Sequence, residues 1–159
     1  RIEVQMESLL RQGLDGITLF STIMHLDTPE YLEHPYRSKL RRGIPGTILH
    51  RKTPVRYPDG CLGEDSIYLD DLRKAYKVGL VDVPHSHLFF RCFHGKNSWD
   101  YNHFFKKLKY TFRDKLSWFV ARRLRRNLLT HPRFRLNETE KKAFAEYMEF
   151  SRAHGLFNS

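Results

Sequence analysis

Cysteine is scarce in this sequence, and long apolar runs are absent. The two cysteines, Cys61 and Cys92, can form neither a disulfide framework nor a zinc site, which favours reduced thiols in a cytoplasmic protein. No run of about 18 apolar residues occurs, so we expect no membrane-spanning helix. The chain begins "RIEVQMESLL", with neither an initiator methionine nor a signal-peptide core, and we expect it to be part of a longer protein.

The apolar content is nevertheless sufficient for a folded core. Of the 159 residues, 40% are hydrophobic and 14% are aromatic, which excludes a disordered tail. The length is that of a single ordinary domain.

The positive charge is concentrated in one segment. The formal net charge is +10, and residues 106–126 contain nine lysines and arginines but a single acidic residue, Asp114. A local basic block of this kind predicts an anionic partner, such as nucleic acid, phospholipid head groups or phosphates.

The hydrophobic pattern alternates between strand and helix periodicity. It predicts a helix over 2–12, a strand over 17–25 and a loop with a short helix at 36–41. A strand over 47–50, a helix over 64–77 and strands over 78–84 and 86–94 follow. The chain is then predicted to form a helix over 99–129 and a last helix that Asn137 caps and Gly155 closes. This alternation indicates an α/β layered fold with an all-helical module appended to the sheet.

Two carboxylates, Glu64 and Asp65, follow a glycine at the start of the predicted helix. One interpretation is structural, because acidic side chains complement the positive end of a helix dipole. The other is chemical, because a carboxylate at a helix start that faces a pocket can act as a general base.

A second cluster lies in "RCFHGKNSW", which places Arg91, His94, Lys96 and Asn97 at a strand end and turn. Cations and imidazole suit a leaving phosphate, whereas the structural interpretation is a solvated turn. The nearby His85, His87 and His103 lack the defined ligand spacing of a zinc site.

The basic segment also has three interpretations. Trp118 and Phe119 beside "ARRLRR" suggest a helix lying on an anionic membrane. A rod that contacts nucleic-acid phosphates is an alternative. The structural interpretation is a helix that packs its apolar stripe on the domain and leaves its charges solvated.

Taken in order, four motifs resemble the second half of a family-two glycosyltransferase of the Rossmann-like GT-A fold. The helix "RIEVQMESL" is similar to the family's R-x-x-x-Q-x-x-x-L pattern, and "GIPGTILHRK" to its glycine-rich segment that approaches the sugar. "LGEDSIYLDDL" matches the acceptor-side Glu-Asp motif, and "FFRCFHGKNSW" resembles an Arg-x-x-His-x-x-Asn stretch.

The resemblance implies inverting transfer of a sugar from a nucleotide-diphosphate sugar to an acceptor hydroxyl. Asp65 would be the catalytic base, and Glu64 would position the acceptor or Asp65. The donor sugar and its diphosphate would be bound by Gly46, Thr47, Arg51, Arg91, His94, Lys96 and Asn97. A divalent metal, Mg²⁺ or Mn²⁺, is implied as cofactor, with His94 as a candidate ligand.

The chain departs from the family pattern in lacking an Asp-x-Asp motif and the nucleotide-binding half expected before Arg1. It also lacks the Gln-x-x-Arg-Trp motif, which favours single sugar addition. Residues 1–104 are thus expected to form the acceptor-side half of a GT-A domain that is incomplete and inactive alone, and residues 105–159 a basic helical extension. An exposed sheet edge would favour a homodimer.

The expected role is cell-surface polysaccharide or glycolipid synthesis at the inner membrane face, with a glycan or lipid-linked glycan as acceptor. The alternative is a non-enzymatic basic module that binds anionic lipid or nucleic acid through residues 106–126.

Overall fold

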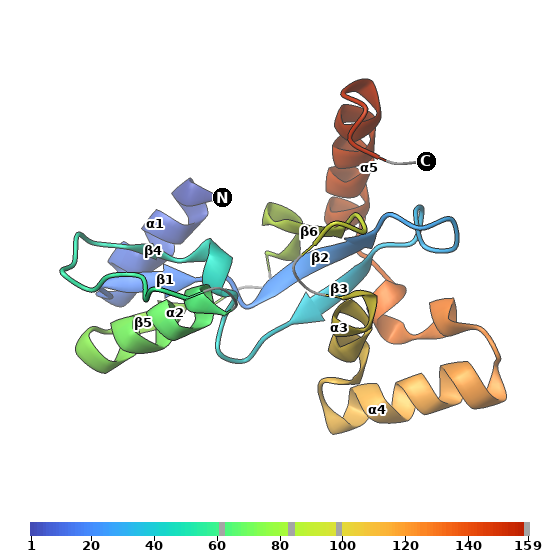
Figure 1. Cartoon of the computed structure of the whole chain (residues 1–159), viewed down its shortest axis with the longest axis horizontal. Coiled ribbons are helices and arrows are strands. Elements are labelled where there is room, and N and C mark those ends of the chain that lie inside the picture. Colours follow the sequence, from blue (N-terminus) through green and yellow to red (C-terminus); the bar gives the residue numbers. More distant parts are fainter. Residues whose placement is uncertain (61–62, 83–84, 98–99, 158–159) are drawn as a thin grey trace. The chain divides into compact units, whose positions relative to one another are not determined.

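The computed structural model describes residues 1–60, 63–82, 85–97 and 100–157. The chain forms two compact units, coloured by sequence in Figure 1. Unit 1 comprises Arg1–Ser21 and Lys39–Phe89, and unit 2 comprises Thr22–Ser38 and Phe90–Ser159. The expected boundary at residue 104 lies within unit 2, and the assignment of the two parts to a GT-A half and an extension stays a prediction.

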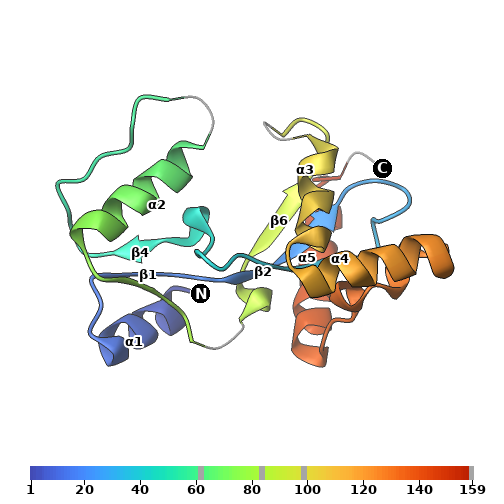
Figure 2. The ribbon, with the colours of Figure 1, turned by 90° about the horizontal axis from the view of Figure 1, so that it is seen from below.

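Unit 1 contains a three-stranded sheet in the order β4-β1-β5. Strand β1 (Gly16–Thr18) pairs antiparallel with β4 (Leu49–His50) and parallel with β5 (Val78–Leu80). Helices α1 (Ile2–Gln12) and α2 (Glu64–Ala75) lie on opposite sides of β1 and β4 in Figure 2. The sheet is therefore mixed and covered by a helix on each face.

A buried glutamine joins three elements of unit 1. The Gln5 side chain of α1 donates hydrogen bonds to the carbonyl oxygens of Ile17 (3.3 Å) and Thr47 (2.6 Å). These bonds pair the buried side-chain amide with two backbone acceptors. The segment Pro45–Thr47, a short 3-10 turn, is thereby attached to α1 and β1.

Unit 2 contains the sheet β3-β2-β6, formed by Tyr36–Lys39, Ser21–Leu26 and Phe90–Phe93. β6 runs parallel to β2, and Figure 1 shows β3 running antiparallel to it. Its helices are α3 (Tyr101–Lys106), α4 (Phe112–Phe119), which continues as a π-helical turn over Val120–Leu124, and α5 (Glu138–Ala153).

The alternation of side chains along β2 places its two faces against different helices. Met24 and Leu26 belong to the core that includes Phe104 of α3. His25, on the other face, contacts the rings of Phe144 and Tyr147 of α5, at centroid distances of 5.4 and 5.5 Å. All six residues of β2 are buried, as expected for a strand covered on both faces.

The predicted strand over 17–25 is divided in the structure. β1 ends at Thr18 and β2 begins at Ser21, and the two strands belong to different sheets. The short helix predicted at 36–41 is wrong, because this segment is β3. Tyr36 and Ser38 are buried, whereas Arg37 between them lies on the other face and pairs with the buried Glu140 of α5, and this alternation has the period of a strand.

Two further predictions required correction. The helix predicted over 99–129 is interrupted, because Thr111 and Asp114 form a capping box that starts a new helix, α4. The strand predicted over 86–94 begins as a 3-10 turn, Ser86–Leu88, and is extended only over Phe90–Phe93. The first part of the predicted helix is α3, capped by Asp100, whose side chain accepts a hydrogen bond from the His103 N–H.

Other predictions are confirmed. α1 ends at Gly13, whose φ is +60°, and α5 starts with the Asn137–Glu140 capping box and is followed by Gly155 at φ +60°. The architecture is mixed α/β, with five α-helices in the described residues. Among these helices, none has the length and apolar composition needed to cross a membrane.

Candidate functional site

The first turn of α2 carries the predicted carboxylates. Gly63 precedes it in a left-handed conformation, with φ +86°, which a glycine adopts without strain. Asp65 is exposed and Glu64 is half-buried. No side chain caps this helix start, so the two carboxylates are the acidic groups that complement its exposed N–H groups.

A pair of tyrosines lies beside Asp65. The rings of Tyr57 and Tyr68 stack with their centroids 4.0 Å apart and their planes 10° apart, and Tyr57 remains 50% exposed. Burial and then the negative charge of the nearby Asp65 carboxylate raise the pKa of Tyr57. The carboxylate and one aromatic face are thus presented together.

Tyr68 is hydrogen-bonded to His50. The Tyr68 hydroxyl lies 3.0 Å from His50 Nε2, and His50 Nδ1 lies 2.7 Å from the carbonyl oxygen of Arg51. Because a carbonyl can only accept, Nδ1 carries a proton, and in the neutral ring Nε2 accepts from Tyr68. This chain of hydrogen bonds orients the ring on which Tyr57 stacks.

The other predicted residues of unit 1 differ in accessibility. Thr47 is buried, and its hydroxyl accepts from the Leu19 N–H (3.0 Å) and lies 2.8 Å from the Thr18 hydroxyl, so it serves the interior. Gly46 is exposed, with open space where a side chain would lie. Arg51 is exposed and lines a pocket of about 110 Å³ together with His50.

The remaining predicted residues lie in unit 2, around the turn after β6. The Asn97 side chain accepts from the His94 N–H (2.8 Å) and donates to the Cys92 carbonyl (3.1 Å), which shapes the turn. His94 and Lys96 are exposed, and the Arg91 guanidinium lies over the Phe104 ring at 5.9 Å. The predicted residues thus form one group in each unit, and their combination into one donor site stays a prediction.

Among the residues that the structure describes, no group of three or more histidine, cysteine, aspartate or glutamate side chains lies close enough to hold a metal ion. A role for His94 as a metal ligand stays a prediction.

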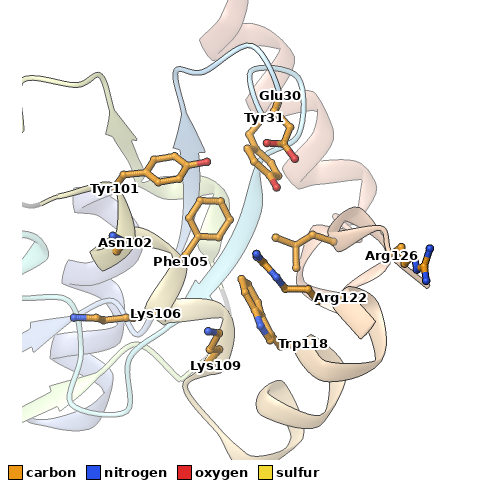
Figure 3. A pocket seen from close by; sticks show the side chains of 11 residues that line it. Glu30, Tyr31, Tyr101, Asn102, Phe105, Lys106, Lys109, Trp118, Arg122 and Arg126 are labelled. Atoms are coloured by element: carbon orange, nitrogen blue, oxygen red, sulfur yellow. The ribbon is translucent and has the colours of Figure 1, made fainter. Parts of the chain in front are cut away.

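Sequence reasoning did not indicate the large pocket of unit 2, shown in Figure 3. Its volume is about 840 Å³, and its aromatic lining comes from the loop after β2, α3 and α4: Tyr31, Tyr101, Phe105 and Trp118. The loop has no periodicity that could have revealed this. The available signal was a tryptophan next to a cluster of arginines.

Four cations and one carboxylate complete this pocket: Lys106, Lys109, Arg122, Arg126 and Glu30. Lys109 Nζ lies 4.2 Å from the centre of the Trp118 ring, and the Arg122 guanidinium lies 5.7 Å from it. Burial and then a hydrogen bond with Glu30 raise the pKa of Tyr31. Among the described lining residues, Glu30 is the one carboxylate against four cations, so the pocket is electropositive.

No protein-family model, curated protein or solved structure matches this chain significantly. The functional proposals therefore depend on two groups of side chains, the carboxylate and tyrosines at the start of α2 and the aromatic and basic pocket of unit 2.

Proposed function

We propose that this chain is the acceptor-side part of an inverting glycosyltransferase of the GT-A fold, with Asp65 as the general base. The observation that carries the proposal is the exposed Asp65 carboxylate at the start of α2, beside the exposed ring of Tyr57. The motifs in the sequence support the same assignment, because this Glu-Asp pair holds the position of the family's acceptor-side motif.

The chemistry requires one proton acceptor on this side of the reaction. The acceptor hydroxyl oxygen forms a bond to C1 of the donor sugar, and the bond from C1 to the diphosphate breaks with its electron pair leaving on the diphosphate. A carboxylate can accept a proton as a general base, and Asp65 takes the hydroxyl proton as the oxygen attacks. Glu64, one residue earlier, positions the acceptor or Asp65.

The tyrosine pair suits a carbohydrate acceptor. The exposed face of Tyr57 offers a flat apolar surface to the C–H face of a sugar ring, while its edge carries a polar hydroxyl. Tyr68 stacks on the other face of this ring, and His50 orients Tyr68 through a hydrogen bond. Binding would therefore place an acceptor hydroxyl near Asp65 without requiring a deep cavity.

The donor side of the proposal depends on the resemblance. In unit 1, Gly46 and Arg51 are accessible. In unit 2, Arg91 and Lys96 supply positive charge that suits a leaving diphosphate, and His94 adds an exposed imidazole beside them. A divalent metal would neutralise charge on that diphosphate. Single sugar addition to a glycan or lipid-linked glycan is the reaction that we propose.

The substitution Asp65→Asn, made in the natural protein, tests this proposal. We expect sugar transfer to fall about 100- to 10,000-fold, the usual contribution of a general base, while donor affinity is unchanged. Transfer is measured with labelled nucleotide sugars, and donor binding by calorimetry.

The matched control is Asp71→Asn on the same helix, where the carboxylate pairs with Lys74 instead of Tyr57. This control should retain transfer. Equal activity of Asp65→Asn and the control would remove Asp65 as the base.

A further inference from the structure

Helix α4 turns an apolar face to solvent. Phe112 is 85% exposed, Leu116 56% and Phe119 55%, and their spacing of four and three residues places them on one side of the helix. The opposite side holds α4 to unit 2 through the buried Ala121 and the ion pair between Asp114 and Arg133. The apolar stripe is thus directed away from the core instead of into it.

Cations surround this exposed face. Arg113, Lys115 and Arg123 are exposed on α4 and the turn that continues it. The one acidic residue of the segment, Asp114, is neutralised by Arg133. The apolar face therefore lies within a strongly positive surface.

The electropositive pocket adjoins the same helix. Trp118 of α4 and Arg122 of the π-helical turn that continues it line the pocket together with Lys106 and Lys109 (Figure 3). In the part of the chain that the structure describes, none of the four pocket cations forms an ion pair with a carboxylate. Arginine and lysine donors that lack a carboxylate partner are the groups that bind phosphate oxygens.

The backbone at the pocket rim supports a functional arrangement. Arg126 has φ +50°, and it is the one non-glycine residue with a positive φ in the described ranges. A left-handed arginine is strained, and such strain is concentrated at functional sites. The arrangement keeps a fourth cation at the pocket.

We propose that unit 2 binds the surface of an anionic phospholipid bilayer, with Phe112, Leu116 and Phe119 in the interface and a lipid phosphate in the α3–α4 pocket. A helix with an apolar face and flanking cations has this chemistry. This inference is independent of the proposed glycosyl transfer.

Charge complementarity selects lipid over the other occupants. A second copy of this face would bring two basic segments together, which is repulsive. Nucleic acid would neutralise the cations but leave the three apolar side chains in water. An anionic bilayer satisfies both the charge and the apolar face.

The test measures flotation of the 159-residue chain with phosphatidylcholine vesicles and with vesicles of 70% phosphatidylcholine and 30% phosphatidylglycerol. We expect binding to the second only, weakening as salt rises. The pocket variant Lys109→Gln/Arg122→Gln should weaken binding about fivefold for each cation removed. The interface variant Phe112→Gln/Phe119→Gln should also lose binding. Because both positions are exposed, we expect this variant to fold normally.

The matched control is Arg135→Gln/Lys142→Gln, which removes two exposed cations of unit 2 outside the pocket and outside α4. This control should bind nearly as wild type. Equal losses in the control and pocket variants, or full binding by the interface variant, would overturn the proposal.

Three measurements distinguish lipid binding from the alternative ligands and partners. Millimolar inorganic phosphate should not displace the chain from vesicles, because it does not occupy the apolar face; displacement would indicate a soluble phosphate ligand instead. Tighter binding of duplex DNA or RNA than of vesicles, retained by the interface variant, would indicate nucleic acid. A wild-type dimer that the interface variant converts to a monomer would indicate a second copy.

Discussion

At the residue scale, Asp114 connects α4 to the rest of unit 2. Its carboxylate accepts from the Thr111 N–H (3.0 Å) and hydroxyl (2.7 Å) and from Arg133 Nε (2.8 Å) and Nη2 (2.6 Å). Burial alone would raise its pKa, but the bonds from Arg133 and Thr111 outweigh burial and lower the pKa to about 2. The ionised form is therefore the one that the fold stabilises.

This shift predicts a pH-dependent effect of Asp114→Asn. Since the folded pKa lies below the ordinary value of 3.8, the stabilisation is present above pH 4 and is lost as the pH falls towards 2. We expect the variant to lower the free energy of unfolding by about 2 kcal/mol at pH 7 and by about half as much at pH 3. Urea unfolding at both pH values measures this, and a difference that does not change with pH would contradict it.

At the element scale, α4 is attached by its ends and by one side only. The capping box at Thr111 begins it, and the π-helical turn and Arg126 end it. In a typical surface helix the apolar stripe faces the core. Here Trp118 packs against the core of unit 2, and the Asp114–Arg133 ion pair and the buried Ala121 complete the attachment, so Phe112, Leu116 and Phe119 stay outside these contacts.

Replacing Arg126, which follows α4 and its π-helical turn, is predicted to raise stability but weaken lipid binding. Arg126→Gly removes the strain of a left-handed arginine, so we expect the free energy of unfolding to rise by about 0.5–1 kcal/mol. The same change removes a pocket cation and should weaken vesicle binding about fivefold. Denaturant unfolding and vesicle flotation measure the two effects, and a gain in stability with unchanged lipid binding would exclude Arg126 from the pocket's function.

At the scale of the whole molecule, neither unit is a continuous stretch of chain. Unit 2 combines Thr22–Ser38 with Phe90–Ser159, and its core places Met24 and Leu26 of β2 against Leu108. α5 covers the other face of the same strand through Phe144 and Tyr147. The central sheet of unit 2 therefore depends on residues on both sides of position 104.

This arrangement predicts the result of truncation. Residues 1–104 expressed alone lack Leu108, α4 and α5, so β2 would expose both of its apolar faces, and we expect unit 2 to be unfolded or aggregated. Nuclear magnetic resonance spectra compared with those of the 159-residue chain would show loss of dispersed signals from β2, β3 and β6. A monodisperse monomer of residues 1–104 with these signals retained would contradict the prediction.

Three helix ends were predictable from the sequence. The stop at Gly13 and the capping box at Asn137 and Glu140 involve residues within a few positions of one another, so local sequence contains all of their partners. The start of α2 at Glu64 was predictable for the same reason. The mixed α/β class followed from the alternation of these local signals.

The sheets and the pocket depended on distant partners instead. The break between β1 and β2, the strand at Tyr36 and the outward face of α4 are set by long-range contacts, such as Gln5 with Thr47 and the Tyr36 hydroxyl with the Phe104 carbonyl (2.5 Å). Local periodicity contains no information about which face such a contact will cover. The carboxylates of α2 were recognisable from a short motif, whereas Tyr57, Trp118 and the cations around it were brought to their partners by folding alone.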